Sequence, residues 1–272
     1  MKFSVVEIKG GFGNQLFQYN FANYLKSQKH NVWINNYWFK TNQDKYDRSE
    51  IFKPDFYGFT KASKFKLKYI ELNDRLFSKD NVKYTPINDE NFHYKNPSIF
   101  NYYFGYWQDV AFLDNTKKFF IKTLSKDPNF NLSINNKYKD SVMIHIRSKD
   151  YGLEKLELEY YENAIKLLNK KSKTYYFNLF TDEKKIVDKL PFKKYLHSVT
   201  TQKANEDDTL STFYEMIKHE NFIISNSTFS FMSALIGSNK NNYVVQPNPW
   251  MKNKNKNKNL YIENWEVVNR NL

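Results

Sequence analysis

Short apolar segments alternate with amphipathic segments along most of this chain, and this alternation restricts the fold more than any other feature. Segments such as 3–8, 141–146 and 222–224 have the length and apolar content of buried strands. Residues 156–168 repeat apolar side chains at the spacing of one helix face. Strands that alternate with helices form a mostly parallel sheet with right-handed crossovers. The sequence therefore predicts an α/β fold.

The same pattern divides the chain into two parts. A stretch rich in Asn, Lys and Asp at 125–140 is the predicted linker, and residues 36–100 are expected to form only short helices and loops. We predict a ligand cleft between two α/β halves, lined by the carboxyl ends of the strands. Strands are predicted at 3–8, 32–34, 141–146, 175–180, 195–199, 222–224 and 243–245. One predicted helix begins at residue 14, and a short one ends at residue 190. The other helices are predicted at 109–124, 156–168, 208–219 and 227–236.

The charge balance suits anionic partners, and it equally suits a Lys- and Asn-rich composition that simply reflects an AT-rich genome. Lys and Arg number 42 against 29 Asp and Glu, which gives 42 − 29 = +13. Nucleic acid, an anionic membrane surface or a phosphate-bearing substrate would all suit this charge. The basic segment 61–69 is read first as a surface helix, with membrane contact as the alternative. No apolar run approaches the ~20 residues that span a bilayer, so a cytoplasmic protein, peripheral on the inner membrane at most, is expected.

The composition also excludes two kinds of site. The chain has no cysteine, so disulfide scaffolds and Cys-ligated zinc are excluded. No Asp-x-Asp pair and no His-x-x-x-His pattern occurs. Because metal-bridged nucleotide transferases need carboxylates on the metal, a site without metal or other cofactor fits the sequence better.

A glycine-rich turn, Gly10-Gly11-Phe12-Gly13-Asn14-Gln15, follows the first predicted strand. Such a turn lets a ligand approach the backbone and exposes the amides of the next helix. A dinucleotide fingerprint would need Gly at the sixth position from Gly11, where Leu16 stands. A Rossmann dehydrogenase is therefore disfavoured. By itself the turn suits a tight structural turn as well as a binding site.

Two further motifs follow predicted strands. Alternation along 141–146 places His145 and Arg147 on the same face, and the guanidinium fork suits a diphosphate. In Ser225–Ser230 one hydroxyl could cap the following helix, while the cluster of hydroxyls and helix-terminal amides would cradle phosphate. Asp182, at the end of another strand, is a candidate for reading ribose or base, or for capping.

Four motifs together resemble the bacterial α-1,2-fucosyltransferase family, known as family 11 of the glycosyltransferases. The opening Gly10–Tyr19 and the late Asn226–Ser230 are similar to its most specific signatures. Gly105-Tyr106-Trp107-Gln108 resembles its mid-chain motif, and His145–Asp150 resembles the His-x-Arg-Arg-x-Asp element that it shares with other fucosyltransferases. The motifs occur in family order, so the resemblance covers nearly the whole chain.

The resemblance implies a GT-B type fold, with two Rossmann-like domains facing a central cleft. Residues 1–130 would be the acceptor-side domain and 131–272 the donor domain, whose last segment is a candidate to return to the first. The implied reaction moves L-fucose from GDP-fucose to O2 of a terminal β-galactoside, with inversion and without a metal. The galactoside would belong to an oligosaccharide or a lipid-linked glycan for O-antigen or capsule.

The resemblance also assigns residues. It implies that Arg147 stabilises the leaving diphosphate and that Asn14 faces the reaction centre. His145 and Asp150 are read as supports rather than as a general base, and no base is assigned. The predicted site comprises catalytic Arg147 and Asn14, donor-binding Gly11, Gly13, His145, Asp182, Asn226, Ser227, Thr228, Phe229 and Ser230, and supporting Lys149 and Asp150.

The chain departs from the family pattern at two places. Ser148 stands where the family has a second Arg, so the diphosphate clamp would depend on Lys149 as a point charge. Phe231-Met232 replaces the usual tandem Trp. These departures keep three alternatives open: a transferase with another nucleotide sugar, an impaired homologue, and a basic protein that binds nucleic acid or another polyanion.

Overall fold

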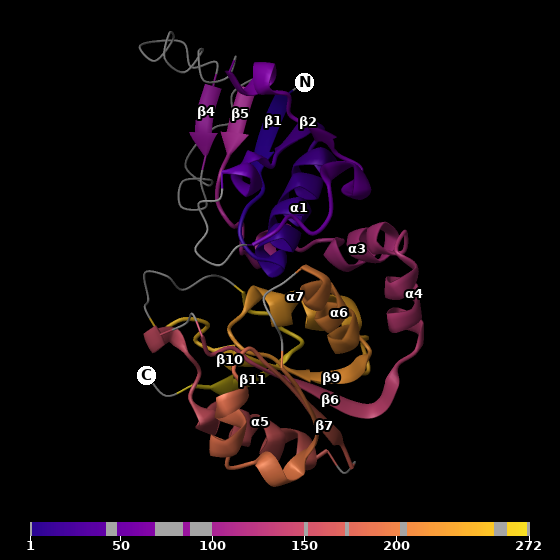
Figure 1. Ribbon diagram of the computed structural model, residues 1–272, viewed down its shortest axis with the longest axis vertical. Helices are drawn as coiled ribbons and strands as arrows, with labels where there is room; N and C mark the ends of the chain where they lie inside the picture. Colours follow the sequence, from indigo (N-terminus) through magenta and orange to yellow (C-terminus); the bar gives the residue numbers. More distant parts are fainter. Residues whose placement is uncertain are drawn as a thin grey trace. The chain divides into compact units, whose positions relative to one another are not determined.

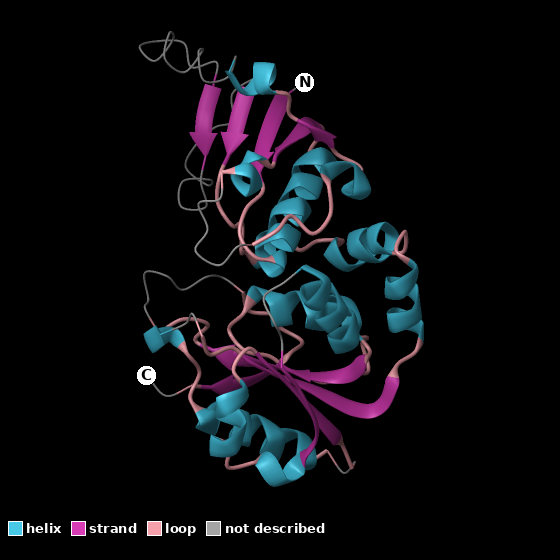
Figure 2. Ribbon diagram, viewed as in Figure 1, coloured by secondary structure: helices cyan, strands magenta, loops and turns pink. Residues whose placement is uncertain are grey.

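The computed structural model describes residues 2–41, 48–68, 84–87, 100–149, 152–171, 174–201, 206–252 and 260–270. The chain divides into two compact units, Met1–Phe119 and Phe120–Leu272. Each unit has its own parallel sheet with helices packed on it, as Figures 1 and 2 show. Two Rossmann-like units in one chain make up the GT-B type, so the predicted α/β class is confirmed.

The first unit contains a five-stranded sheet in the order β3-β2-β1-β5-β4, with all strand pairs parallel. Helix α1 (Phe12–Ser27) follows β1 and buries a broad apolar face that includes Leu16 and Phe17. The strands are β1 (Lys2–Glu7), β2 (His30–Asn35), β3 (Thr60–Lys61), β4 (Tyr84–Ile87) and β5 (Phe100–Tyr103).

The second unit contains a six-stranded parallel sheet in the order β11-β10-β9-β6-β7-β8. In chain order this is the doubly wound arrangement, in which the strand succession reverses between β6 and β9. The strands are β6 (Tyr138–Ile146), β7 (Tyr176–Thr181), β8 (Leu196–Thr201), β9 (His219–Ile223), β10 (Val244–Asn248) and β11 (Glu266–Asn269). The helices are α3 (Thr116–Leu124), which begins at the end of the first unit, α4 (Pro128–Asn135), α5 (Leu158–Asn169), α6 (Glu206–Ile217) and α7 (Thr228–Gly237).

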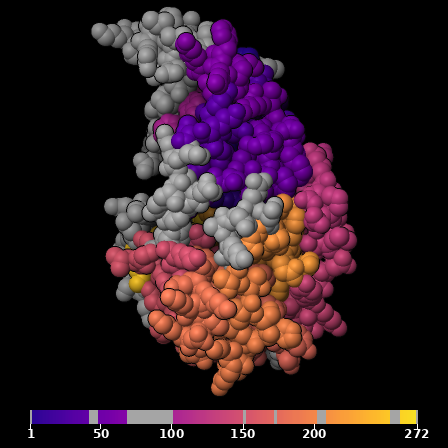
Figure 3. Space-filling view, viewed as in Figure 1, coloured from indigo at the N-terminus to yellow at the C-terminus, as the bar shows by residue number. Residues whose placement is uncertain are grey.

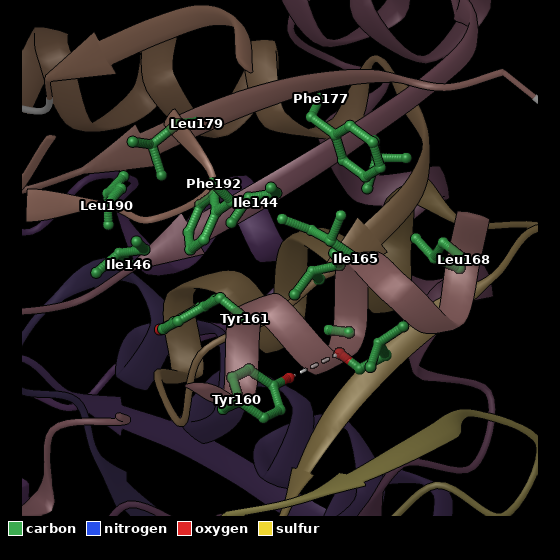
Figure 4. Close-up of a cluster of buried hydrophobic side chains, with 14 of the residues drawn as sticks. Ile144, Ile146, Tyr160, Tyr161, Ile165, Leu168, Phe177, Leu179, Leu190 and Phe192 are labelled. Carbon is green, nitrogen blue, oxygen red and sulfur yellow. Dashed lines mark hydrogen bonds between the residues drawn. The ribbon is translucent and has the colours of Figure 1, made fainter. Parts of the chain in front are cut away.

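Helix α5 closes one face of the second sheet. Tyr161, Ile165 and Leu168 pack against side chains of β6 and β7, as Figure 4 shows. The buried Tyr160 hydroxyl donates to the carbonyl oxygen of Ile224 at 2.7 Å, just after β9. This bond gives a buried polar group a partner and holds α5 over the strand that precedes the Ser225–Ser230 motif.

Short 3-10 helices occupy three connections where the sequence predicts longer or different elements. The predicted helix 109–124 is a 3-10 helix η3 (Val110–Phe112) followed by α3. The predicted helix to residue 190 is the 3-10 helix η5 (Lys184–Lys189), and η6 (Lys193–Tyr195) leads into β8. Asp109 accepts a hydrogen bond from Ala111 N at 2.8 Å, and this cap stabilises the separate short turn.

The predicted linker at 125–140 is wrong, because it contains α4 and the beginning of β6. Asp127 caps α4 by accepting from Asn129 N at 2.9 Å, and Pro128 occupies the first helical position. Phe130 is fully buried, which gives this polar stretch an anchor. The polar composition of this segment is that of a linker, but its N-terminal cap and one buried aromatic side chain make it a helix.

Strands β3, β4, β5 and β11 were not predicted. β4 contains Pro86 and lies at the edge of the first sheet, where a residue without an N–H group is tolerated. β3 has only two residues. β11 pairs with β10 and so extends the second sheet, whereas the last segment was a candidate to return to the first domain.

Replacement of Gly237 is expected to destabilise the second unit. A Cβ there would lie 2.8 Å from Phe222 Cζ and 3.2 Å from the Cα and O of Ile217, at the point where α7 crosses the end of α6. Gly237→Ala should lower the free energy of unfolding by about 1–3 kcal/mol in urea titrations. Gly11→Ala is the control, since its Cβ would meet only Arg48 atoms at 3.7 and 3.8 Å. Equal stability of both variants would contradict this packing.

Candidate functional site

The motifs predicted from the sequence lie at the points where the strand order of each sheet reverses. In the first sheet β2 and β3 lie on one side of β1, and β5 and β4 lie on the other. The turn Gly10–Gly13 follows β1, and Gly105–Gln108 follows β5. In the second sheet His145–Lys149 covers the end of β6 and Ser225–Ser230 follows β9. Ligands of doubly wound sheets bind outside the carboxyl ends of the strands at such points.

In the first turn, the backbone at Gly10 lies so close to neighbouring side chains that only glycine fits there. Gly10 has φ +77°, and a Cβ on it would lie 3.2 Å from Asn14 Nδ2 and 3.4 Å from Tyr106. Gly11 precedes α1 in an extended conformation with no side-chain cap, and the buried Gly13 lies in the first turn of the helix. The turn therefore presents the N-terminal end of α1 beside Tyr106 of the second motif.

Two glutamines of α1 tie the loops around this turn together, and they were not singled out from the sequence. Gln15 Nε2 donates to Gly10 O at 2.9 Å and to Ser49 O at 2.8 Å. Gln18 accepts from Lys9 N at 2.9 Å and donates to Gly105 O at 2.9 Å. Both side chains are buried. A pair of amides on the apolar face of a predicted helix was the signal that could have identified them.

Asn14 is held by the second motif. Its Oδ1 accepts from Gln108 Nε2 at 2.8 Å, so its orientation is set across the switch point of the first sheet. Trp107 stacks on Phe21 with ring centroids 3.8 Å apart and is buried. The Gly-aromatic-aromatic-Gln motif thus uses its Trp for packing and its Gln to position Asn14.

In the second unit Arg147 and Asp182 form a short ion pair. Arg147 Nε lies 3.1 Å from Asp182 Oδ2, with the arginine side chain 24% exposed and the aspartate 7% exposed. Asp182 also accepts from Ser148 N at 2.8 Å and from Lys149 N at 3.3 Å. Both carboxylate oxygens are therefore used to fix the Arg147 loop. This arrangement makes Asp182 a support for the guanidinium, while the sequence suggested base or ribose contact or a cap.

His145 joins the two motifs of the second unit. Its Nδ1 lies 2.9 Å from Ser225 Oγ, which in turn lies 3.2 Å from Ser230 Oγ. Burial, with a smaller contribution from the Arg147 charge, lowers the pKa of His145 from 6.5 to about 3. The imidazole is consequently neutral at physiological pH and has the protonation state of a structural support.

The late motif is buried except at Thr228. Ser230 Oγ donates to Ser227 O at 3.1 Å, and Phe229 packs beside His145 with centroids 6.0 Å apart. Thr228, the first residue of α7, is half-buried. Ser227 precedes the helix and makes no side-chain cap hydrogen bond. Ser227 and Thr228 thus lie at the N-terminus of α7, and a phosphate contact there stays a prediction, whereas Phe229 and Ser230 contribute to packing.

Several buried polar atoms at this switch point have no partner within the described part of the chain. They are His145 Nε2, Ser148 Oγ and Asn226 Oδ1. Buried polar groups are nearly always satisfied, so a cluster of exceptions is typical of a place where a polar ligand or water binds. All three belong to the two motifs at the ends of β6 and β9, so this edge of the second sheet has the character of a site for a polar ligand.

A buried arginine holds the surrounding loops in place. Arg270 donates to the carbonyl oxygens of Glu154 at 3.1 Å and Lys155 at 2.9 Å. Asn226 Nδ2 donates to the same Glu154 carbonyl at 2.8 Å, and Lys252 N donates to the Glu154 carboxylate at 2.7 Å. The loop after the Arg147 motif, the late motif and the last strand are therefore connected. No sequence motif marked Arg270.

Of the two residues predicted to support the site, the structure describes one. Lys149 is exposed beside Arg147. Asp150 lies outside the described residues. Across the described ranges there is no group of three or more His, Asp or Glu residues that could hold a metal ion. Nor does any described helix combine the length and apolarity needed to cross a membrane.

The neutral His145 predicts a pH dependence of stability. Between pH 6.5 and about 3 the unfolded chain binds a proton at this residue that the folded chain does not. The free energy of unfolding therefore falls as the pH falls through this range, by up to about 1.4 kcal/mol per pH unit. Urea titrations at pH 7, 6 and 5 should show wild type losing roughly 2 kcal/mol more than His145→Asn. Parallel losses would contradict the buried neutral imidazole.

Comparisons with known proteins place these motifs in a family. The family model described as glycosyl transferase family 11 matches residues 50–269, a region that holds three of the four motifs. The O-antigen biosynthesis glycosyltransferase WbnK of Escherichia coli is 24% identical over 179 residues, which cover 60% of this chain and 59% of that protein. The match thus spans less than two thirds of this relative.

Solved structures show weaker likeness. The fucosyltransferase NodZ from Bradyrhizobium has 13% identity and a TM-score of 0.49, over 86% of this chain and 93% of that one. The Escherichia coli heptosyltransferase WaaC with ADP has 12% identity and a TM-score of 0.43, over 99% and 93%.

Proposed function

Because this chain belongs to glycosyl transferase family 11, we propose that it transfers L-fucose from GDP-fucose to O2 of a terminal β-galactoside. Membership of the family makes it a glycosyltransferase. The choice of fucose and of the galactoside acceptor rests on the four motifs that resemble α-1,2-fucosyltransferases. The name of the Escherichia coli relative supports an O-antigen glycan, free or lipid-linked, as the acceptor.

The observation that carries the proposal is the meeting of the His145–Lys149 and Ser225–Ser230 motifs at the switch point of the second sheet. A permanently charged guanidinium, a helix N-terminus and unpartnered buried polar atoms are gathered at one sheet edge. Each of these features favours an anionic, polar ligand. We assign the nucleotide diphosphate to this edge.

In the proposed reaction the bond between fucose C1 and the β-phosphate oxygen breaks as the acceptor O2 bonds to C1 from the opposite face. The electron pair leaves with GDP, and Arg147 stabilises the charge that develops on the β-phosphate. Asp182 keeps Arg147 in place through the 3.1 Å ion pair. The proton of the acceptor hydroxyl leaves to solvent or buffer base. Because cationic and amide groups of the chain face this charge, we propose that no metal takes part.

We also assign a role to a residue of the first unit. Asn14 is oriented by Gln108 at the switch point of the first sheet, and we assign it to the acceptor sugar. Amide groups suit this task because they both donate to and accept from sugar hydroxyls.

The test is GDP release from GDP-fucose with β-galactoside acceptors in EDTA, with GDP-mannose and UDP-galactose as control donors. Acceptor-dependent release from GDP-fucose alone supports the proposal. Release from another donor would assign a different sugar, and binding without release would point to the departure at Ser148. If no nucleotide sugar binds, the proposed function is wrong.

A further inference from the structure

A cluster of lysines surrounds the aromatic side chains at one edge of the first sheet. We propose that this surface docks the protein on the headgroups of an anionic phospholipid bilayer. The inference is independent of which donor and acceptor the enzyme uses. The lysine surface consists of Lys40, Lys61, Lys64, Phe65, Lys66 and Lys68.

The ammonium groups converge on two rings. Those of Lys40, Lys61 and Lys64 lie 5.7, 4.9 and 6.0 Å from the centroid of the Tyr37 ring. The ammonium group of Lys66 lies 3.8 Å from the centroid of the Trp33 ring. Cation–π contacts hold the side chains in place without neutralising them. Charges from two separate segments, Lys40 and residues 61–68, are thus concentrated on one area.

Within the described part of the chain, positive charge exceeds negative charge around these lysines. Residues 60–68 contain four lysines and no acidic residue. Among the described residues none of the five lysines of the surface forms an ion pair with a carboxylate. Burial lowers the pKa of Lys61, the charges of Lys40 and Lys53 add to this shift, and the Glu50 carboxylate opposes it. Like charges held this close repel one another, and an anionic surface would relieve the repulsion.

An exposed aromatic side chain lies within the charged area. Phe65 is 80% exposed, in a helical turn at residues 64–68. At 100° per residue, Phe65 shares an arc of the turn with Lys64 and Lys68. On the other side of the turn, Leu67 packs against Val5 and Ala62 of the sheet. An apolar side chain that projects between lysines is typical of segments that lie in the headgroup region.

The observations favour a bilayer over a nucleic acid. Single-stranded nucleic acids bind by stacking bases on aromatic faces along a basic groove. Here lysines lie over the rings of Tyr37 and Trp33, and Trp33 also stacks on Phe3 with centroids 5.4 Å apart. The one freely exposed ring, Phe65, has no second ring beside it among the rings of the surface.

Vesicle sedimentation tests the proposal with the full chain. Wild type is mixed with vesicles of phosphatidylcholine alone or with about one third phosphatidylglycerol, at low and high salt. We expect binding to the anionic vesicles only, weakened by salt. The triple variant Lys61→Gln/Lys64→Gln/Lys68→Gln should bind on the order of a hundredfold more weakly, from about fivefold per lysine. Phe65→Ser should weaken binding and leave its salt dependence unchanged.

The matched control removes the same charge elsewhere. Lys184, Lys185 and Lys189 are exposed on η5, in the orange part of the second unit's surface in Figure 3. Their triple change to Gln should leave vesicle binding within a few-fold of wild type. Equal loss in both triples would show that net charge alone attracts the protein, and would overturn the proposal. So would absence of vesicle binding, or binding of a labelled single-stranded RNA in its place.

Discussion

Arg147→Ala is expected to reduce kcat for sugar transfer by about 10²–10³, because one preorganised donor to the developing charge is worth that much. The fold should survive, since Asp182 retains its hydrogen bonds from the backbone N–H groups of Ser148 and Lys149. Stopped assays of GDP release, with melting temperatures of the same samples, measure both effects.

Conservative variants separate charge from geometry at this position. Arg147→Lys keeps the charge but loses the fork and should recover only part of the rate. Asp182→Asn should lower kcat by less than Arg147→Ala, because Arg147 remains but is less firmly oriented. Lys185→Gln serves as an exposed control of equal charge change. Near-normal turnover of Arg147→Ala would remove this residue from the mechanism.

Arg270→Ala is expected to have the largest effect on stability. The arginine side chain is fully buried and lies 3.6 Å from the Glu157 carboxylate and 3.9 Å from that of Glu154. Its removal takes a hydrogen-bond donor from the Glu154 and Lys155 carbonyl oxygens and leaves a cavity, which together cost about 3–5 kcal/mol. For a unit of this size the melting temperature should fall by roughly 10 °C. Calorimetry or urea titration of purified variants gives the value.

Lys171→Met is the matched control, because Lys171 pairs with Glu266 on the same last strand at 2.8 Å but is partly exposed. Loss of such a surface pair should change stability by at most about 1 kcal/mol. If Arg270→Ala is no more destabilising than Lys171→Met, the buried network does not support the fold.

The central strands β1 and β6 could be predicted from the sequence because they contain short apolar runs, whereas the inner strand β5, which pairs with β1, was missed. Val142, Ile144 and Ile146 of β6 are all buried, and such runs have few alternatives to a strand. Edge strands were missed for the opposite reason. β4 carries Pro86 at an edge and β11 carries Glu266 at another, so neither has the apolar run of a central strand.

The motifs predicted which residues gather at the candidate site, but not which partners hold them. His145 and Arg147 were placed on one face by strand alternation, and the Arg147–Asp182 contact spans 35 positions that no local pattern describes. Arg270 lies near the end of the chain, where a lone basic residue in a basic protein carries no signal. Contacts between distant segments come from the order of strands in the sheet, which one sequence leaves open.

The hydrogen bonds that connect the motifs have a consequence for folding. Gln18 and Gly105 are 87 positions apart, and His145 and Ser225 are 80 positions apart. Such bonds close late, because the chain between them must already be ordered. A partly folded unit therefore lacks the ligand-binding edge at the carboxyl ends of its strands. Ligand affinity arises only when the whole sheet has formed. Any ligand held at these points stabilises an entire unit, rather than the loops that touch it.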